Sequence, residues 1–70
     1  MSLTITVNGE AQSLPAGTTV ASVVEQFSAA PQGRGVAVAV GGEVVPRAAW
    51  GQTELAEGAQ VEVVAAVQGG

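Results

Sequence analysis

The sequence predicts an α+β domain in which a mixed sheet of four to five strands packs on one main helix. Apolar residues alternate with polar ones from Leu3 to Val7, and the pair Asn8-Gly9 follows at once, which indicates a strand and a tight turn. Apolar residues spaced by three and four positions from 20 to 27 indicate an amphipathic helix. Two further apolar segments of strand length, 36–40 and 61–66, complete the sheet, and one helix can cover only one of its faces.

The first strand is expected to turn back on itself. Asn-Gly favours a type I′ turn of two residues, so the segment from Glu10 to Leu14 should run antiparallel to the first strand. The sequence Pro15-Ala16-Gly17 should end this second strand, because proline and glycine interrupt regular structure.

The helix is expected to begin after Thr18 and Thr19, which are both candidate N-caps. Its apolar face consists largely of valine, which has low intrinsic helix propensity. Packing of this face against the sheet must therefore stabilise the helix. Pro31 and Gly33 are predicted to mark its end.

The second half of the chain predicts three more strands. The run Val36–Val40 suits a strand that is covered on one face and partly screened on the other. Glu43–Val45 reads as a short strand, and Pro46, which lacks a backbone donor, places it at an edge or ends it. The segment 47–58 is predicted to be mostly loop with one helical turn.

The last strand runs directly into the sequence Val67-Gln68-Gly69-Gly70. We expect it to lie parallel to the first strand at the centre of the sheet, with the intervening residues as the crossover. This order of elements is that of a β-grasp, or ubiquitin-like, fold. Residues 1–66 are expected to form this single domain, and residues 67–70 a flexible diglycine tail.

The composition excludes most catalytic and metal-binding chemistry by the chain alone. Its 70 residues include no Cys, His, Lys, Asp or Tyr, so the usual metal ligands and nucleophile pairs are missing. We therefore expect a protein that is not an enzyme and that binds no metal or cofactor. A net charge of -4 argues against nucleic acid and favours a basic protein surface as partner. No segment could span a bilayer, and we expect a cytoplasmic protein.

The diglycine end is the remaining candidate for chemistry. Glycine lacks a Cβ, so two in a row form a backbone thin enough to enter a narrow active site of another protein, with the Gly70 carboxylate at its tip. The alternative is a frayed end, since glycine is frequent in this chain, at 10 of 70 residues.

Several short motifs, in order over nearly the whole chain, resemble the thiamine-biosynthesis sulfur carrier family (ThiS). The most specific are Val44-Val45-Pro46-Arg47 followed by Trp50, and the diglycine end. Two loop residues depart from the family pattern: Gly41 stands where Asn is common, and Ala59 where Asp is common. The supporting segments are Val7-Asn8-Gly9-Glu10, Gly17-Thr18-Thr19-Val20, Val36-Ala37-Val38-Ala39-Val40, Leu55, Glu57-Gly58 and Val67-Gln68-Gly69-Gly70.

This resemblance implies a two-step activation by other proteins. An E1-like, ThiF-type adenylating enzyme would use ATP to convert the Gly70 carboxylate to an acyl-adenylate. Sulfur from a persulfide donor, such as a cysteine desulfurase, would then leave a thiocarboxylate on Gly70. A ThiG-type thiazole synthase would use that sulfur. The alternatives are a molybdopterin-synthase type of sulfur carrier, a ubiquitin-like protein modifier and a non-catalytic binding module.

The other candidate residues are assigned to partner binding. Gly69 would provide clearance in the partner's channel, whereas Val67 and Gln68 would either pair with a partner's strand or form a frayed strand end. Trp50 is expected to cover the open end of the core or to contact a partner, and Arg47 to pair with Glu43, to face an acidic patch of a partner or to be solvated.

The sheet face that the helix leaves uncovered is the last candidate surface. Its expected members are Val38 or its neighbours, Val45 and Val64. An exposed apolar patch of this kind usually marks a binding surface.

Overall fold

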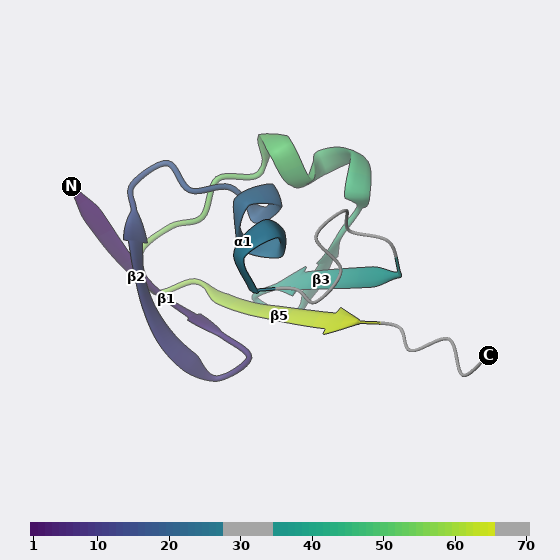
Figure 1. The fold of residues 1–70 in the computed structure, drawn as a ribbon, viewed down its shortest axis with the longest axis horizontal. Helices are drawn as coiled ribbons and strands as arrows, with labels where there is room; N and C mark the ends of the chain where they lie inside the picture. Colours follow the sequence, from purple (N-terminus) through teal and green to yellow (C-terminus); the bar gives the residue numbers. More distant parts are fainter. Residues whose placement is uncertain (28–34, 66–70) are drawn as a thin grey trace.

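The computed structural model describes residues 1–27 and 35–65, which form five strands, one α-helix and one 3-10 helix (Figure 1). The predicted end of the helix at Pro31 and Gly33 lies outside the described residues. The elements are β1 (Ser2–Val7), β2 (Glu10–Pro15), α1 (Val20–Phe27), β3 (Val36–Val40), β4 (Glu43–Val45), η1 (Arg47–Gln52) and β5 (Gln60–Ala65).

The strands form one mixed sheet in the order β2-β1-β5-β3-β4. The parallel pair β1 and β5 lies at its centre, which confirms the predicted β-grasp topology. The short strand β4 lies at one edge, as Pro46 directly after it led us to expect. Figure 1 shows α1 and η1 on the same side of the sheet.

The hairpin between β1 and β2 has the predicted turn. Asn8 and Gly9 have φ values of 53° and 86°, the positive values that a type I′ turn requires at both central positions. The turn pairs Val7 with Glu10 and fixes the register of the whole hairpin. Because side chains alternate along a strand, this register directs Leu3, Ile5 and Val7 into the core.

The helix α1 begins with a side-chain cap. The hydroxyl oxygen of Thr19 accepts a hydrogen bond from the backbone N–H of Ser22 at 3.3 Å, which confirms Thr19 as an N-cap. The Thr18 hydroxyl instead donates to the carbonyl oxygen of Pro15 at 2.6 Å. This bond stabilises the bend that leads from β2 into the helix.

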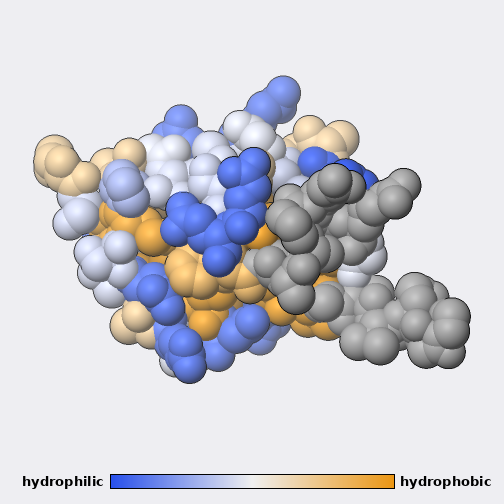
Figure 2. All heavy atoms as spheres, viewed as in Figure 1, coloured by the Kyte–Doolittle hydropathy of each residue, from blue (hydrophilic) through white to orange (hydrophobic). Residues whose placement is uncertain are grey.

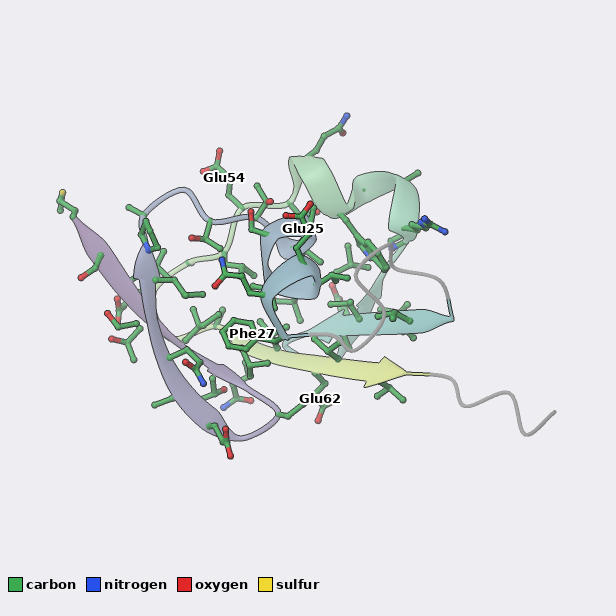
Figure 3. All side chains as sticks on the ribbon, in the orientation of Figure 1. Glu25, Phe27, Glu54 and Glu62 are labelled. Atoms are coloured by element: carbon green, nitrogen blue, oxygen red, sulfur yellow. The ribbon has the colours of Figure 1, made fainter. Side chains whose placement is uncertain are left out.

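The core consists mostly of small, branched side chains from the helix and from the inner face of the sheet. Each fully buried valine contributes about 1.5–3 kcal/mol relative to an exposed one. Phe27 is partly buried against the core and lies between α1 and the strands (Figure 3), and hydrophobic residues reach the surface in the middle of the molecule (Figure 2). The buried apolar residues are Leu3, Ile5, Val7, Leu14, Val20, Val23, Val24, Val38, Trp50, Leu55 and Val61.

The segment after β4 is more ordered than predicted. We expected mostly loop with one helical turn, but Arg47–Gln52 forms a 3-10 helix that packs against α1. Trp50 supplies the reason, because its indole is only 7% exposed and anchors the segment to the core. A buried aromatic side chain of this size outweighs the weak local preference of an Ala- and Gly-containing segment.

Candidate functional site

The candidate site begins where β5 ends. This strand lies between β1 and β3, and its last residue, Ala65, pairs with Val36 at the start of β3. The predicted site residues Val67, Gln68, Gly69 and Gly70 lie outside the described residues, so their roles and the flexible tail stay predictions. The structure defines the end of β5, from which the C-terminal segment starts.

The two edges of β5 make different hydrogen bonds. Toward β3, the carbonyl oxygen of Gln60 accepts a hydrogen bond of 2.8 Å from the N–H of Gly41. The even-numbered residues of β5 therefore direct their backbone N–H and C=O groups toward β3. Toward β1, the carbonyl oxygen of Val61 accepts a bond of 2.8 Å from the backbone N–H of Asn8. Odd-numbered residues of β5 therefore direct their backbone groups toward β1.

A side chain continues the pairing on the β1 edge. The carboxamide oxygen of Asn8 accepts a hydrogen bond of 2.9 Å from the N–H of Val63, and its nitrogen donates one of 3.2 Å to the Val63 carbonyl oxygen. From the sequence, the structural role expected of Asn8 was in the turn. Nothing in the local pattern indicates this second contact, because its partner lies 55 positions away in the chain.

The sheet face opposite α1 contains Val64, as predicted. Val64 is 59% exposed, and its neighbour Glu62 points away from α1 on the far side of β5 (Figure 3). Val44 is 74% exposed on the same face, since it pairs with Ala39 while Ala37 pairs with Val64. We refer to these four side chains, Ala37, Ala39, Val44 and Val64, as the apolar patch.

The prediction named Val38 or its neighbours for β3, and the neighbours Ala37 and Ala39 are the ones that lie on this face. The prediction that Val45 belongs to it is wrong. Val38 and Val45 pair with each other on the core side of the sheet, where Val38 is 1% exposed and Val45 packs against the core. The physical reason is the turn at Gly41-Gly42, which pairs Val40 with Glu43 and so fixes the register of β4. A two-residue glycine turn is itself a sequence signal, and it would have assigned Val44 to the open face instead.

Trp50 has the structural role expected of a cover over the core. Its indole N–H donates a hydrogen bond of 3.0 Å to the carbonyl oxygen of Val45, and the ring is almost wholly buried. Little of the ring is therefore left for a partner to touch. The exposed Arg47 places its guanidinium carbon 6.0 Å from the centre of the indole ring, within the range of a cation–π contact. A partner contact through Arg47 stays a prediction.

Within residues 1–27 and 35–65, no three Glu side chains gather in a way that could hold a metal ion. Over the same described part of the chain, no helix has the length and apolar character needed to cross a membrane.

The five-stranded mixed sheet over one helix, with parallel first and last strands at its centre, defines a small β-grasp protein. A model of the ThiS family matches residues 5–70, and the chain belongs to this family. No curated protein matches the sequence significantly.

Among solved structures, the thiamine biosynthesis protein (ThiS) from Geobacter metallireducens is similar, with a TM-score of 0.77 and 30% sequence identity. The alignment covers 97% of this chain and 100% of that chain. The resemblance noted from short motifs is thereby confirmed at the level of the family and of the fold.

Proposed function

We propose that this protein is the sulfur carrier of thiamine biosynthesis, and that Gly70 holds the sulfur as a thiocarboxylate. The observation that supports this most is the family match, which extends to Gly70 and so includes both the central strand β5 and the diglycine that follows it. The chain offers no thiol, imidazole or amine side chain that could compete with a carboxylate for this role.

The proposed chemistry starts with adenylation, because a carboxylate is a poor electrophile. A Gly70 carboxylate oxygen attacks the α-phosphorus of ATP, a P–O bond forms, and pyrophosphate leaves. The terminal sulfur of a donor persulfide then attacks the acyl carbon and displaces AMP. Reduction of the remaining S–S bond by a thiol releases the thiocarboxylate. Since the chain contains no cysteine, partners must supply both sulfur and thiol.

The partners that this chemistry requires are an adenylating enzyme of the ThiF type, a persulfide donor and a thiazole synthase of the ThiG type. The donor would be a cysteine desulfurase or a similar protein. ATP is a substrate of the adenylating enzyme, and the carrier itself needs no bound cofactor. The carrier would act together with these enzymes in the cytoplasm.

We assign docking of the adenylating enzyme to the apolar patch. Val64 is in β5 itself, one residue before the end of the described chain, so a partner that covers the patch lies next to the start of the C-terminal segment. The acidic side chain of Glu62, which pairs with Ala39 on the same face, is exposed beside it. A partner with an apolar centre and a basic side chain opposite Glu62 would match this surface.

The direct test is the intact mass of the carrier after incubation with the adenylating enzyme, ATP and a persulfide donor. We expect one oxygen to be replaced by sulfur, and the fragment that contains Gly70 to hold the change. The matched control is a variant with one alanine added after Gly70, which keeps the fold but moves the carboxylate. An unchanged mass for the natural chain, or thiocarboxylate formation by the extended one, would contradict the proposal.

A gene deletion separates this function from the nearest alternative. Loss of the carrier should create a thiamine requirement and leave molybdoenzyme activity intact. A molybdopterin carrier would give the opposite pattern, and a protein modifier would leave isopeptide adducts on other proteins. The similarity to a solved thiamine biosynthesis protein favours the first outcome.

A further inference from the structure

Asn8 contacts β5 through more than its backbone. Its N–H donates to the Val61 carbonyl oxygen at 2.8 Å, as expected for the last step of a parallel ladder. Its carboxamide then pairs with both backbone groups of Val63, at 2.9 and 3.2 Å. One residue therefore holds two successive positions of β5 that face β1.

The carboxamide takes the place of a strand that has already turned away. β1 ends at Val7, and the type I′ turn directs the chain toward β2. A carboxamide has the same donor and acceptor as a peptide group, so it can occupy the next position of the ladder. Asparagine is also one of the few residues other than glycine that accept the positive φ of this turn. Both properties are needed at position 8.

The contact lies at the start of the C-terminal segment. Val63 is two positions before Ala65, where the described part of β5 ends. On its other edge β5 is paired with β3 as far as Ala65. Without the carboxamide, Val63 would keep a partner strand on one edge only, and a strand end held on one side frays more easily than one held on both.

From this geometry we infer that Asn8 is a positioning residue for the reactive C-terminus. Its carboxamide fixes the direction in which β5 leaves the sheet, and so reduces the conformational freedom that is lost when Gly70 enters a partner's active site. This inference rests on the proposed function, because it assigns to Asn8 a role in presenting the Gly70 carboxylate.

The turn and the carboxamide can be separated by substitution. Asn8→Gly keeps the positive φ, since Gly-Gly also forms type I′ turns, but removes both bonds to Val63. Asn8→Asp keeps the acceptor for the Val63 N–H and loses the donor. Glu57→Ala is the matched control, because the Glu57 carboxylate accepts a bond of 3.0 Å from the N–H of Thr4, near the opposite end of the same ladder.

The first measurement is adenylation kinetics with the full chain, ATP and the adenylating enzyme, well below the melting temperature of every variant. Asn8→Gly should lose the net binding free energy typical of one or two hydrogen bonds. We therefore expect the KM for the carrier to be about five- to ten-fold higher in this variant. Asn8→Asp should raise KM about two- to three-fold. In all variants kcat should stay near the natural value, because the bound carboxylate meets the same active site.

The second measurement needs no enzyme. NMR order parameters of the backbone at residues 64–65 should fall from about 0.85 toward 0.6 in Asn8→Gly and stay unchanged in Glu57→Ala. Equal KM values for Asn8→Gly and the natural chain, an equal rise in Glu57→Ala, or unchanged order parameters would each overturn the inference. If the natural chain is not adenylated at all, the proposed function fails, and the order parameters still decide whether Asn8 fixes the strand end.

Discussion

The indole nitrogen of Trp50 donates a hydrogen bond of 3.0 Å to the carbonyl oxygen of Val45. This bond connects η1 to the edge strand β4, which precedes it in the chain with Pro46 between them. The buried indole also closes the core beside α1. Trp50 is therefore a structural residue with two separable contributions, burial and one hydrogen bond.

Substitution of Trp50 by Phe should separate the contribution of burial from that of the hydrogen bond. Phe keeps most of the buried aromatic surface but leaves the Val45 carbonyl without its donor, so we expect a loss of about 1–2 kcal/mol in the free energy of unfolding. Trp50→Ala should cost about 3–5 kcal/mol, because it also leaves a cavity. Urea denaturation monitored by circular dichroism measures the free energy of unfolding of both variants. Tryptophan fluorescence is not suitable, because both variants lack the only tryptophan. Equal stability of Trp50→Phe and the natural chain would show that the bond contributes nothing.

The register of β4 predicts different stability losses for alanine substitutions at Val38 and Val44. Val38→Ala removes buried methyl groups from the core side of the sheet and should cost about 1.5–3 kcal/mol. Val44→Ala changes a side chain that is 74% exposed and should stay within about 0.5 kcal/mol of the natural chain. Trp50 fluorescence in a denaturant series reports both values. A larger loss for Val44→Ala than for Val38→Ala would mean that the register is shifted by one residue.

Local patterns predicted most of this fold. The alternation in β1, the Asn8-Gly9 turn and the helical spacing from Val20 to Phe27 depend on neighbours in the chain, and each was found as expected. The face of β4 was missed because Val44 and Val45 are the same residue type, so their composition cannot distinguish inside from outside. Only the geometry of the preceding turn does so.

The site was less predictable for a different reason. The pairing of Asn8 with Val63 joins residues 55 positions apart, and it exists only because β1 and β5 are neighbours in the folded sheet. A sequence read one segment at a time assigns Asn8 to its turn and has no reason to seek a second partner. One helical turn was expected between residues 47 and 58, but the extent of η1 was underestimated, because burial of Trp50 is a property of the assembled core.

Two glycines with equal space around them should respond differently to alanine. Apart from the glycine itself and its two chain neighbours, no heavy atom lies within 4 Å of a Cβ built at Gly42 or Gly51, so neither substitution creates a steric clash with another part of the fold. Gly42, however, has a φ of 86°, which L-residues rarely adopt, and Gly42→Ala should cost about 1 kcal/mol. Gly51→Ala should be neutral or stabilise by up to about 1 kcal/mol, because it lowers the entropy of the unfolded chain.

The melting temperatures of the two glycine variants test this difference in stability. For a domain of this size, about 1 kcal/mol corresponds to a shift of roughly 4–8 °C in the melting temperature. We expect Gly42→Ala to melt lower and Gly51→Ala to melt no lower than the natural chain. Identical losses in both variants would mean that the backbone conformation of Gly42 is not what sets the cost.

The apolar patch can be tested against the remainder of the same sheet face. Val64→Glu introduces a charge into the patch next to the C-terminal segment, and desolvation of that charge on docking should weaken binding to the adenylating enzyme about ten-fold or more. Ser13→Glu introduces the same charge on the same face, on β2, and is the matched control. Both positions are exposed, so both variants should fold with nearly natural stability.

The measurement is the dissociation constant of each variant for the adenylating enzyme by calorimetry, at two salt concentrations. If docking uses the apolar patch, Val64→Glu loses affinity at both concentrations, because the loss comes from burial of a charge and not from long-range repulsion. Ser13→Glu should bind like the natural chain at high salt. Equal affinities of the two variants would place the docking surface elsewhere on the domain, and would leave the C-terminal segment as the main contact with the enzyme.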